Sequence, residues 1–178
     1  KLLNKKVEMK VPQVMVLSFN EVASALGGPD KLMAGIYLQV EKGITGSILF
    51  LMTREDAYKF IEIFTGCSIL ADINITDIQK SVLLEIGNIL TGAYLTALSD
   101  LTKINICPSV PALAIDMMGA LLSVPLSRYA YIGDKALLIN AEFEEGSHKV
   151  KGHFLLIPDA ASFAIIFKAL GVNFDGSS

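Results

Sequence analysis

The sequence contains few cysteines and few histidines. Its two cysteines, Cys67 and Cys107, are too few for a disulfide framework, and this usage fits a reducing, cytoplasmic compartment. Neither cysteine has a second cysteine or a histidine at the spacing of a metal site. The two histidines, His148 and His153, lack carboxylate or cysteine partners at ligand spacing, so we interpret both as strand side chains. No metal site is predicted.

Charged residues are also scarce, and the basic ones form no cluster. The chain has 15 lysines and arginines against 18 acidic residues, a formal net charge of −3. No basic stripe is present that could neutralise a phosphate backbone, so nucleic acid is excluded as a partner. No stretch resembles a signal peptide, and Glu85, Asn88 and Pro125 interrupt the most apolar segments well short of about twenty residues. No membrane insertion is expected.

Apolar side chains, in contrast, are abundant. Hydrophobic residues make up 52% of the chain and charged residues only 19%, a balance that excludes intrinsic disorder. A chain of 178 residues with this composition can bury a sizeable core and matches the length of one globular domain. We therefore predict a single domain over residues 1–178.

A strand followed by a helix occurs twice, with a period of about one hundred residues. The apolar strand Gly46–Met52 leads into a helix that ends at Gly66, and Gly152–Pro158 leads into a helix that ends at Gly171. This period is far too long for a solenoid repeat. We interpret it as a duplicated α/β half folded about a pseudo-twofold axis.

Further elements of the repeated unit lie upstream of each strand–helix pair. A glycine-containing turn separates two strand-like runs within residues 32–53, and another does so within 135–158, which predicts two matched hairpins. Before each hairpin, a Val-Pro step at Pro12 or Pro111 is followed by alternating apolar residues. The sequence therefore predicts an α+β fold with pseudo-twofold duplication, in which long helices pack on antiparallel β-sheet.

A longer helix, expected over roughly residues 76–100, lies between the two units. We assign residues 1–66 to the first half-repeat and 76–172 to the second. No equivalent long helix precedes the first half, so we expect this half to be truncated at its N-terminus. The loss would uncover apolar surface, which either the missing segment or a helix of a neighbouring copy would cover.

The long helix carries a narrow polar face. Ser81, Glu85, Asn88 and Gly92 recur at spacings of four, three and four residues, which places them on one side of a helix. The rest of the circumference is mostly apolar, so the helix should pack heavily on its remaining sides. A carboxylate and a carboxamide therefore stand side by side in a polar window.

Two glycines in this helix, Gly87 and Gly92, allow two interpretations. Each costs the helix roughly 1 kcal/mol relative to alanine, a penalty usually tolerated where something must approach closely. A partner surface docked over the polar face would explain them. Alternatively, the glycines permit tight helix–sheet packing, and Glu85 and Asn88 are only the solvated face of an amphipathic helix. Periodicity alone favours this second interpretation.

A longer pattern runs beyond the helix: Ser81, three residues, Glu85, two residues, Asn88, 22 residues, then Pro111. It resembles the signature of the CheC, CheX and FliY phosphatase family of bacterial and archaeal chemotaxis, in which Asp or Ser, Glu, Asn and Pro stand at these spacings. The sequence around the motif, over residues 85–92 and 108–117, is most similar to the CheC type. The resemblance spans nearly the whole chain and implies a CheC-like fold.

The resemblance also implies a role for each motif residue. The family's substrate is the phosphoaspartate of a CheY-like response regulator, which supplies the Mg²⁺, so the chain needs no cofactor of its own. Asn88 would hold the attacking water in line with the leaving oxygen, and Glu85 would pair with the regulator's active-site lysine. Ser81 would lie at the edge of the contact. Pro111 would shape the strand beside the helix, although an ordinary strand-edge proline is an equal alternative.

Two alternatives to an active phosphatase remain open. The chain could be a non-catalytic binding module, either a flagellar switch component or an adaptation protein that sequesters CheD, the receptor-modifying deamidase. The intact pair Glu85 and Asn88 favours catalysis, because switch-protein middle domains share this fold without being phosphatases. One departure from the family is expected: CheC proteins commonly carry two such helices, and counting back from Pro12 by the same spacing places the first asparagine before residue 1.

Overall fold

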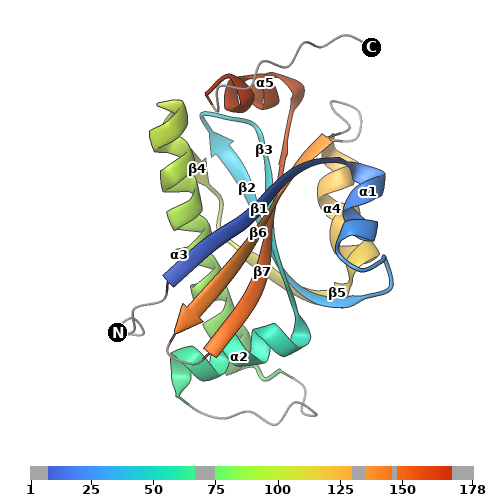
Figure 1. Ribbon diagram of the computed structural model, residues 1–178, viewed down its shortest axis with the longest axis vertical. Coiled ribbons are helices and arrows are strands. Elements are labelled where there is room, and N and C mark those ends of the chain that lie inside the picture. Colours follow the sequence, from blue (N-terminus) through green and yellow to red (C-terminus); the bar gives the residue numbers. More distant parts are fainter. Residues whose placement is uncertain (1–7, 67–74, 130–134, 146–147, 170–178) are drawn as a thin grey trace.

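The computed structural model describes residues 8–66, 75–129, 135–145 and 148–169, which form seven strands and five helices (Figure 1). The first run of elements is β1 (Glu8–Ser18), α1 (Phe19–Ala25), β2 (Leu32–Lys42), β3 (Gly46–Thr53) and α2 (Arg54–Thr65). A second run repeats this order as β5 (Ala112–Met117), α4 (Met118–Tyr129), β6 (Lys135–Glu145), β7 (His148–Pro158) and α5 (Ala160–Ala169). Between them lie α3 (Asp77–Thr102) and the short strand β4 (Cys107–Pro108).

The two runs form one antiparallel sheet, in which the first strand of each run pairs with the hairpin of the other run. The strand order is β1-β6-β7-β3-β2-β4, and β5 also pairs with β2. β1 thus pairs with the hairpin of the second run and β5 with the hairpin of the first, while β3 and β7 pair at the centre. This arrangement confirms the predicted α+β class and the pseudo-twofold duplication.

Local signals in the sequence set the limits of these elements. Both predicted hairpins are present, as β2–β3 and β6–β7. At the start of α3, the Thr76 hydroxyl accepts the backbone N–H of Gln79 and the Gln79 side chain accepts that of Thr76, which forms a capping box. Gly66 ends α2 in the left-handed conformation with φ of 71°. The predicted helix end at Gly171 lies outside the described residues.

Helices cover both faces of the sheet, so the central strands are buried on both sides. Helices α2, α3 and α5 pack on one face, and α1 and α4 pack on the other (Figure 1). Along β3, Ile48 and Phe50 contribute to the first core, whereas Leu49 and Leu51 contribute to the second. This alternation follows from the two-residue period of a strand.

Helix α3 packs on the sheet through a row of stacked aromatic rings. Tyr94 stacks on Phe154 at a centroid distance of 5.2 Å, and Phe154 stacks on Phe50 at 4.5 Å. Burial raises the pKa of the Tyr94 hydroxyl above its ordinary value. Among the described helices, only α3 is both long and apolar enough to cross a membrane, and here it packs on the sheet as a core helix.

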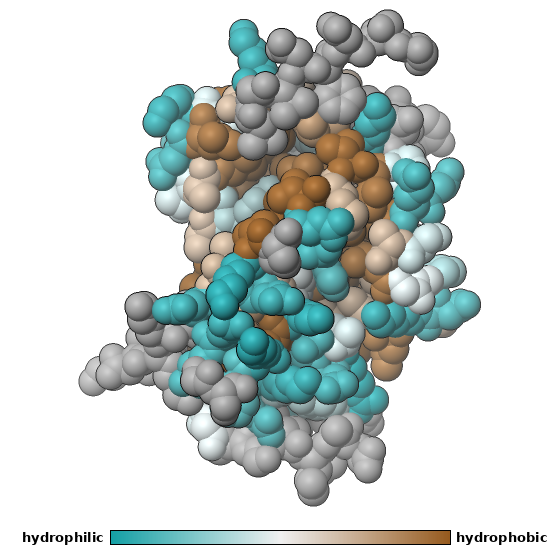
Figure 2. Space-filling model, in the orientation of Figure 1, coloured by the Kyte–Doolittle hydropathy of each residue, from teal (hydrophilic) through white to brown (hydrophobic). Residues whose placement is uncertain are grey.

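An apolar strip is exposed on the edge strand β1. Val14 pairs with Ile139 and Val16 with Leu137, yet the two valines are 53% and 37% exposed while their partners are buried. Figure 2 shows hydrophobic side chains gathered along the C-terminal half of this strand. On the corresponding strand β5, Ile115 packs against the core that α3 completes. The two edges of the sheet therefore differ in how they are covered.

His153 is a strand side chain within β7, as the sequence indicated. Its Nδ1 lies 2.7 Å from Oδ1 of Asn140, and the amide nitrogen of Asn140 donates to Oε1 of Gln13 at 3.1 Å. This row of hydrogen bonds crosses β7, β6 and β1. Burial lowers the pKa of His153, and the positive charge of Lys31 lowers it further.

The chain should lose stability as the pH falls below the ordinary histidine value of 6.5. Because the folded-state pKa of His153 is below the unfolded-state value, the unfolded chain binds more protons in that range, and the free energy of unfolding decreases. Urea denaturation between about pH 7.5 and 5 measures the effect. His153→Gln keeps a donor for Asn140 and should flatten the dependence. An equal pH dependence in both proteins would contradict this assignment.

Candidate functional site

Gly87 sets how closely α3 approaches the sheet. A Cβ atom on this residue would overlap the side chain of Ile36, which is fully buried in β2. Only glycine therefore permits this contact. Ile36 pairs with Leu113 of β5, so the crossing point also fixes α3 beside the edge strand. For Gly87, the interpretation as a packing residue is confirmed.

The polar face of α3 points away from the sheet. Ser81, Glu85 and Asn88 are all exposed. Residues three apart on a helix have Cβ atoms about 5–6 Å from each other, so the carboxylate and the carboxamide are neighbours. The Ser81 hydroxyl donates to the Asp77 carbonyl at 2.9 Å. Within the described part of the chain, the side chains of Glu85 and Asn88 have no hydrogen-bond partner, so both remain available to a bound molecule.

Pro111 lies half-buried just before β5, in a segment held against β2. The Ser109 backbone N–H donates to the Gln39 carbonyl at 2.8 Å, and the Gln39 N–H donates to the Ser109 hydroxyl at 3.0 Å. Ala112, which follows Pro111, pairs with Tyr37 of β2. Pro111 thus precedes the edge strand that borders α3.

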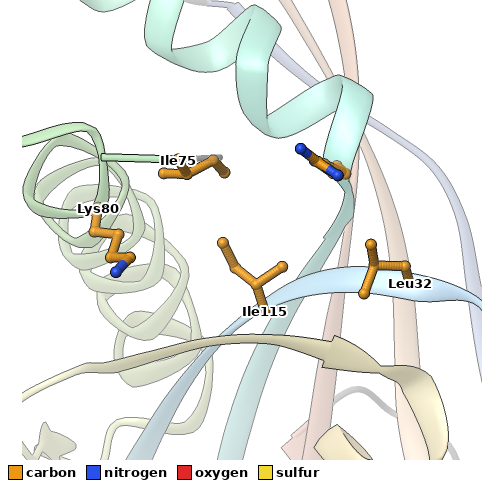
Figure 3. A pocket seen from close by; sticks show the side chains of 5 residues that line it. Leu32, Ile75, Lys80 and Ile115 are labelled. Carbon is orange, nitrogen blue, oxygen red and sulfur yellow. The ribbon is translucent and has the colours of Figure 1, made fainter. Parts of the chain in front are cut away.

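A hollow of about 420 Å³ lies beside the first turn of α3, between this helix, α2 and the edge of the sheet (Figure 3). The described residues that line it are three aliphatic side chains, Leu32, Ile75 and Ile115, with Lys80 and Arg54. Glu85 and Asn88 are not among them. The pair stands instead on an open helix face. Small molecules usually bind in enclosed pockets, so this open face is better suited to a protein substrate that presents its own reactive group.

Near this face, the described residues include no group of possible metal donors. Among the described residues, no three His, Cys, Asp or Glu side chains lie close enough to one another to hold a metal ion. Glu85 and Asn88 give the polar face of α3 an ionisable acid and a neutral amide. An amide can accept a hydrogen bond through its oxygen while it donates through its nitrogen, so it can orient a water molecule.

A second hollow, of about 280 Å³, continues the polar face beyond Gly92. Thr96 and Ser99 line it at four and seven residues after Gly92, so the helical period could have identified them. Asn105 and Pro108 line it from the segment that follows the helix, and no local pattern in the sequence indicates that they return to α3.

Comparison with known proteins places these residues in a family. A sequence model described as the CheC-like family matches residues 78–115, which include Ser81, Glu85, Asn88 and Pro111. A curated relative, the CheY-P phosphatase CheC of Bacillus subtilis (strain 168), is 40% identical over 179 residues, covering 97% of this chain and 84% of the relative. The chain belongs to the CheC family. The predicted resemblance is confirmed.

Solved structures agree with the CheC-like fold. The chain is similar to FliY of Thermotoga maritima, with a TM-score of 0.71 at 18% identity, covering 96% of this chain and 84% of FliY. It is also similar to a chain in the crystal structure of the FliM–SpeE complex of H. pylori, with a TM-score of 0.63 at 13% identity, covering 96% of this chain and 82% of that one. At these identities the likeness concerns the fold alone.

Proposed function

We propose that this CheC-family chain is a phosphatase that hydrolyses the phosphoaspartate of a CheY-like response regulator. The outward presentation of Glu85 and Asn88 from one face of α3, without partners inside the described part of the chain, carries this proposal. The CheY-P phosphatase named among its relatives, at 40% identity, supports the same substrate class. The reaction is a chemotaxis adaptation step in the cytoplasm.

Asn88 orients the attacking water. Its amide oxygen accepts a hydrogen bond from the water, and its amide nitrogen donates toward a phosphoryl oxygen. The water oxygen attacks phosphorus as the bond to the aspartate oxygen breaks, which yields inorganic phosphate and a free carboxylate, and the water proton passes to phosphate or solvent. An acyl phosphate already has a good leaving group, so positioning the water is the main task left to the phosphatase.

Glu85 holds the regulator in register. It lies one turn before Asn88 and pairs with the lysine of the regulator's active site, which draws this cation aside. An exposed ion pair contributes little in open solvent, but the contact strengthens when the two surfaces exclude water. Glu85 is therefore an orienting residue and does not act as a base.

The remaining motif residues support this contact. Ser81 lies at the edge of the interface, and Pro111 shapes the segment before β5. The Mg²⁺ that neutralises the phosphoryl group belongs to the regulator, so the chain carries no cofactor of its own. CheD is a predicted second partner, and no contact among the described residues tests this prediction.

A phosphate-decay assay tests this function. A phosphorylated CheY-like regulator is mixed with a tenfold lower concentration of the chain, and remaining phosphoprotein is followed over time. A catalyst turns over, so we expect faster loss of all the phosphate. A module that only sequesters CheD or joins a flagellar switch would leave the decay at its intrinsic rate, and that result would refute the phosphatase proposal.

A further inference from the structure

Nothing in the described part of the chain requires glycine at position 92. Glycine is among the poorest helix formers, and Gly92 lies in the interior of α3. Unlike Gly87, whose Cβ would overlap Ile36, a Cβ on Gly92 would meet no atom within 4 Å. The backbone here does not adopt a positive φ either. Packing on the sheet therefore explains the first glycine and leaves the second unexplained.

The position of Gly92 relates it to the proposed active site. It follows Asn88 by four residues, so it lies on the same helix face and about 6 Å further along the axis. It also forms part of the wall of the second hollow, of about 280 Å³. The open side of Gly92 thus connects the acid–amide pair with a concave surface at the C-terminal end of α3.

The polar groups of this hollow are mostly engaged. The Thr96 hydroxyl donates to the Gly92 carbonyl at 2.9 Å, and the Ser99 hydroxyl donates to the Ile104 carbonyl. Asp100 is exposed in the same wall. The hollow therefore offers a partner its shape, the Asp100 carboxylate and the exposed side chain of Asn105.

From these observations we infer that the main chain of the bound regulator touches α3 at Gly92, with a loop of the regulator seated in the second hollow. This inference rests on the proposed function. A flexible side chain of a partner could move aside for an added methyl group, whereas a main-chain segment held in a folded regulator could not. Glycine is thus required where backbone meets backbone. Gly92 is a positioning residue for the reaction.

The inference predicts opposite changes in stability and activity for one substitution. Gly92→Ala removes a poor helix former without creating a clash, so the melting temperature should rise by roughly 2–4 °C. The same methyl group would push the regulator away one turn from Asn88. Because a misplacement of about 1 Å can reduce a rate about 100-fold, kcat/KM should fall at least about tenfold. Gly92→Leu, whose larger side chain would displace the regulator further, should reduce it by about 100-fold or more.

Two controls separate contact from bulk and from helix propensity. Ala93→Leu places the same leucine side chain at the next residue, which is exposed and lies about 100° around the helix, off the polar face. Gly119→Ala replaces a glycine of α4, where a Cβ would make only an ordinary 3.4 Å contact with Pro29. Both variants should retain wild-type kcat/KM. The measurements are thermal unfolding and decay of phosphorylated regulator, with Asn88→Ala as the inactive reference.

The outcomes distinguish this inference from the function on which it rests. If Gly92→Leu is as active as wild type while Asn88→Ala is inactive, the phosphatase stands and the contact at Gly92 is refuted. If Ala93→Leu loses as much activity as Gly92→Leu, the effect is not specific to Gly92 and the inference also fails. A wild-type chain that does not accelerate phosphate loss would refute both together.

Discussion

Replacing Asn88 by alanine should reduce phosphatase turnover by about 10²–10³-fold, to the intrinsic decay of the phosphorylated regulator. The loss follows from removing both hydrogen bonds that orient the water. Because Asn88 is exposed and has no partner in the described chain, the substitution should not lower the free energy of unfolding. Affinity for the regulator should stay within about threefold, since most of the contact surface is unchanged.

Asn88→Asp is the matched control for shape. It keeps the size of the side chain but loses the N–H donor and places a negative charge toward the phosphoryl group. It should therefore be as inactive as Asn88→Ala. A variant that keeps wild-type turnover but binds more weakly would show that Asn88 contributes to affinity, and it would contradict the water-orienting role.

Replacing Phe50 by alanine should cost about 3–5 kcal/mol of the free energy of unfolding. Phe50 is fully buried in the central strand β3, where it stacks on Phe154 and meets Phe143 edge-on at 6.0 Å. Its removal leaves a cavity in the row of rings that supports α3 through Tyr94. Urea denaturation of the purified variant measures this loss.

Phe50→Leu gives a second, milder variant that should fold even if the alanine variant does not. It keeps most of the buried apolar volume and should show a smaller loss in the same direction. Val110→Ala is the surface control, because Val110 is 87% exposed, and it should change stability by less than about 0.5 kcal/mol. A loss below about 1 kcal/mol for Phe50→Ala would contradict the central place of this ring in the core.

Much of the fold was predictable because its signals are local. The hairpins β2–β3 and β6–β7 follow from alternating apolar residues around short turns, and α3 follows from its helical period and the capping box at Thr76. The exchange of β1 and β5 between the two runs was not predictable in this way. It depends on pairing between residues far apart in the sequence, such as Leu17 with Ala136 and Tyr37 with Ala112, which local patterns do not encode.

The candidate site was likewise predictable only where its signals are local. Helical spacing placed Glu85 and Asn88 on one face, and the structure finds both exposed there. Spacing could not distinguish the two glycines, because the difference lies in what surrounds them: Ile36 fills the space beside Gly87, and the space beside Gly92 is open. The chemical roles of the pair came from the family resemblance, since a helix face alone does not specify a reaction.

Phosphate loss from a phosphorylated CheY-like regulator, measured in a single turnover with the chain in saturating excess, tests the account most directly. Saturation removes differences in binding, so the rate reports only the chemical step. Wild type should release phosphate far faster than the regulator alone, and Asn88→Ala should match the regulator alone. Equal acceleration by wild type and Asn88→Ala would contradict the assignment of Asn88 as the residue that positions the water.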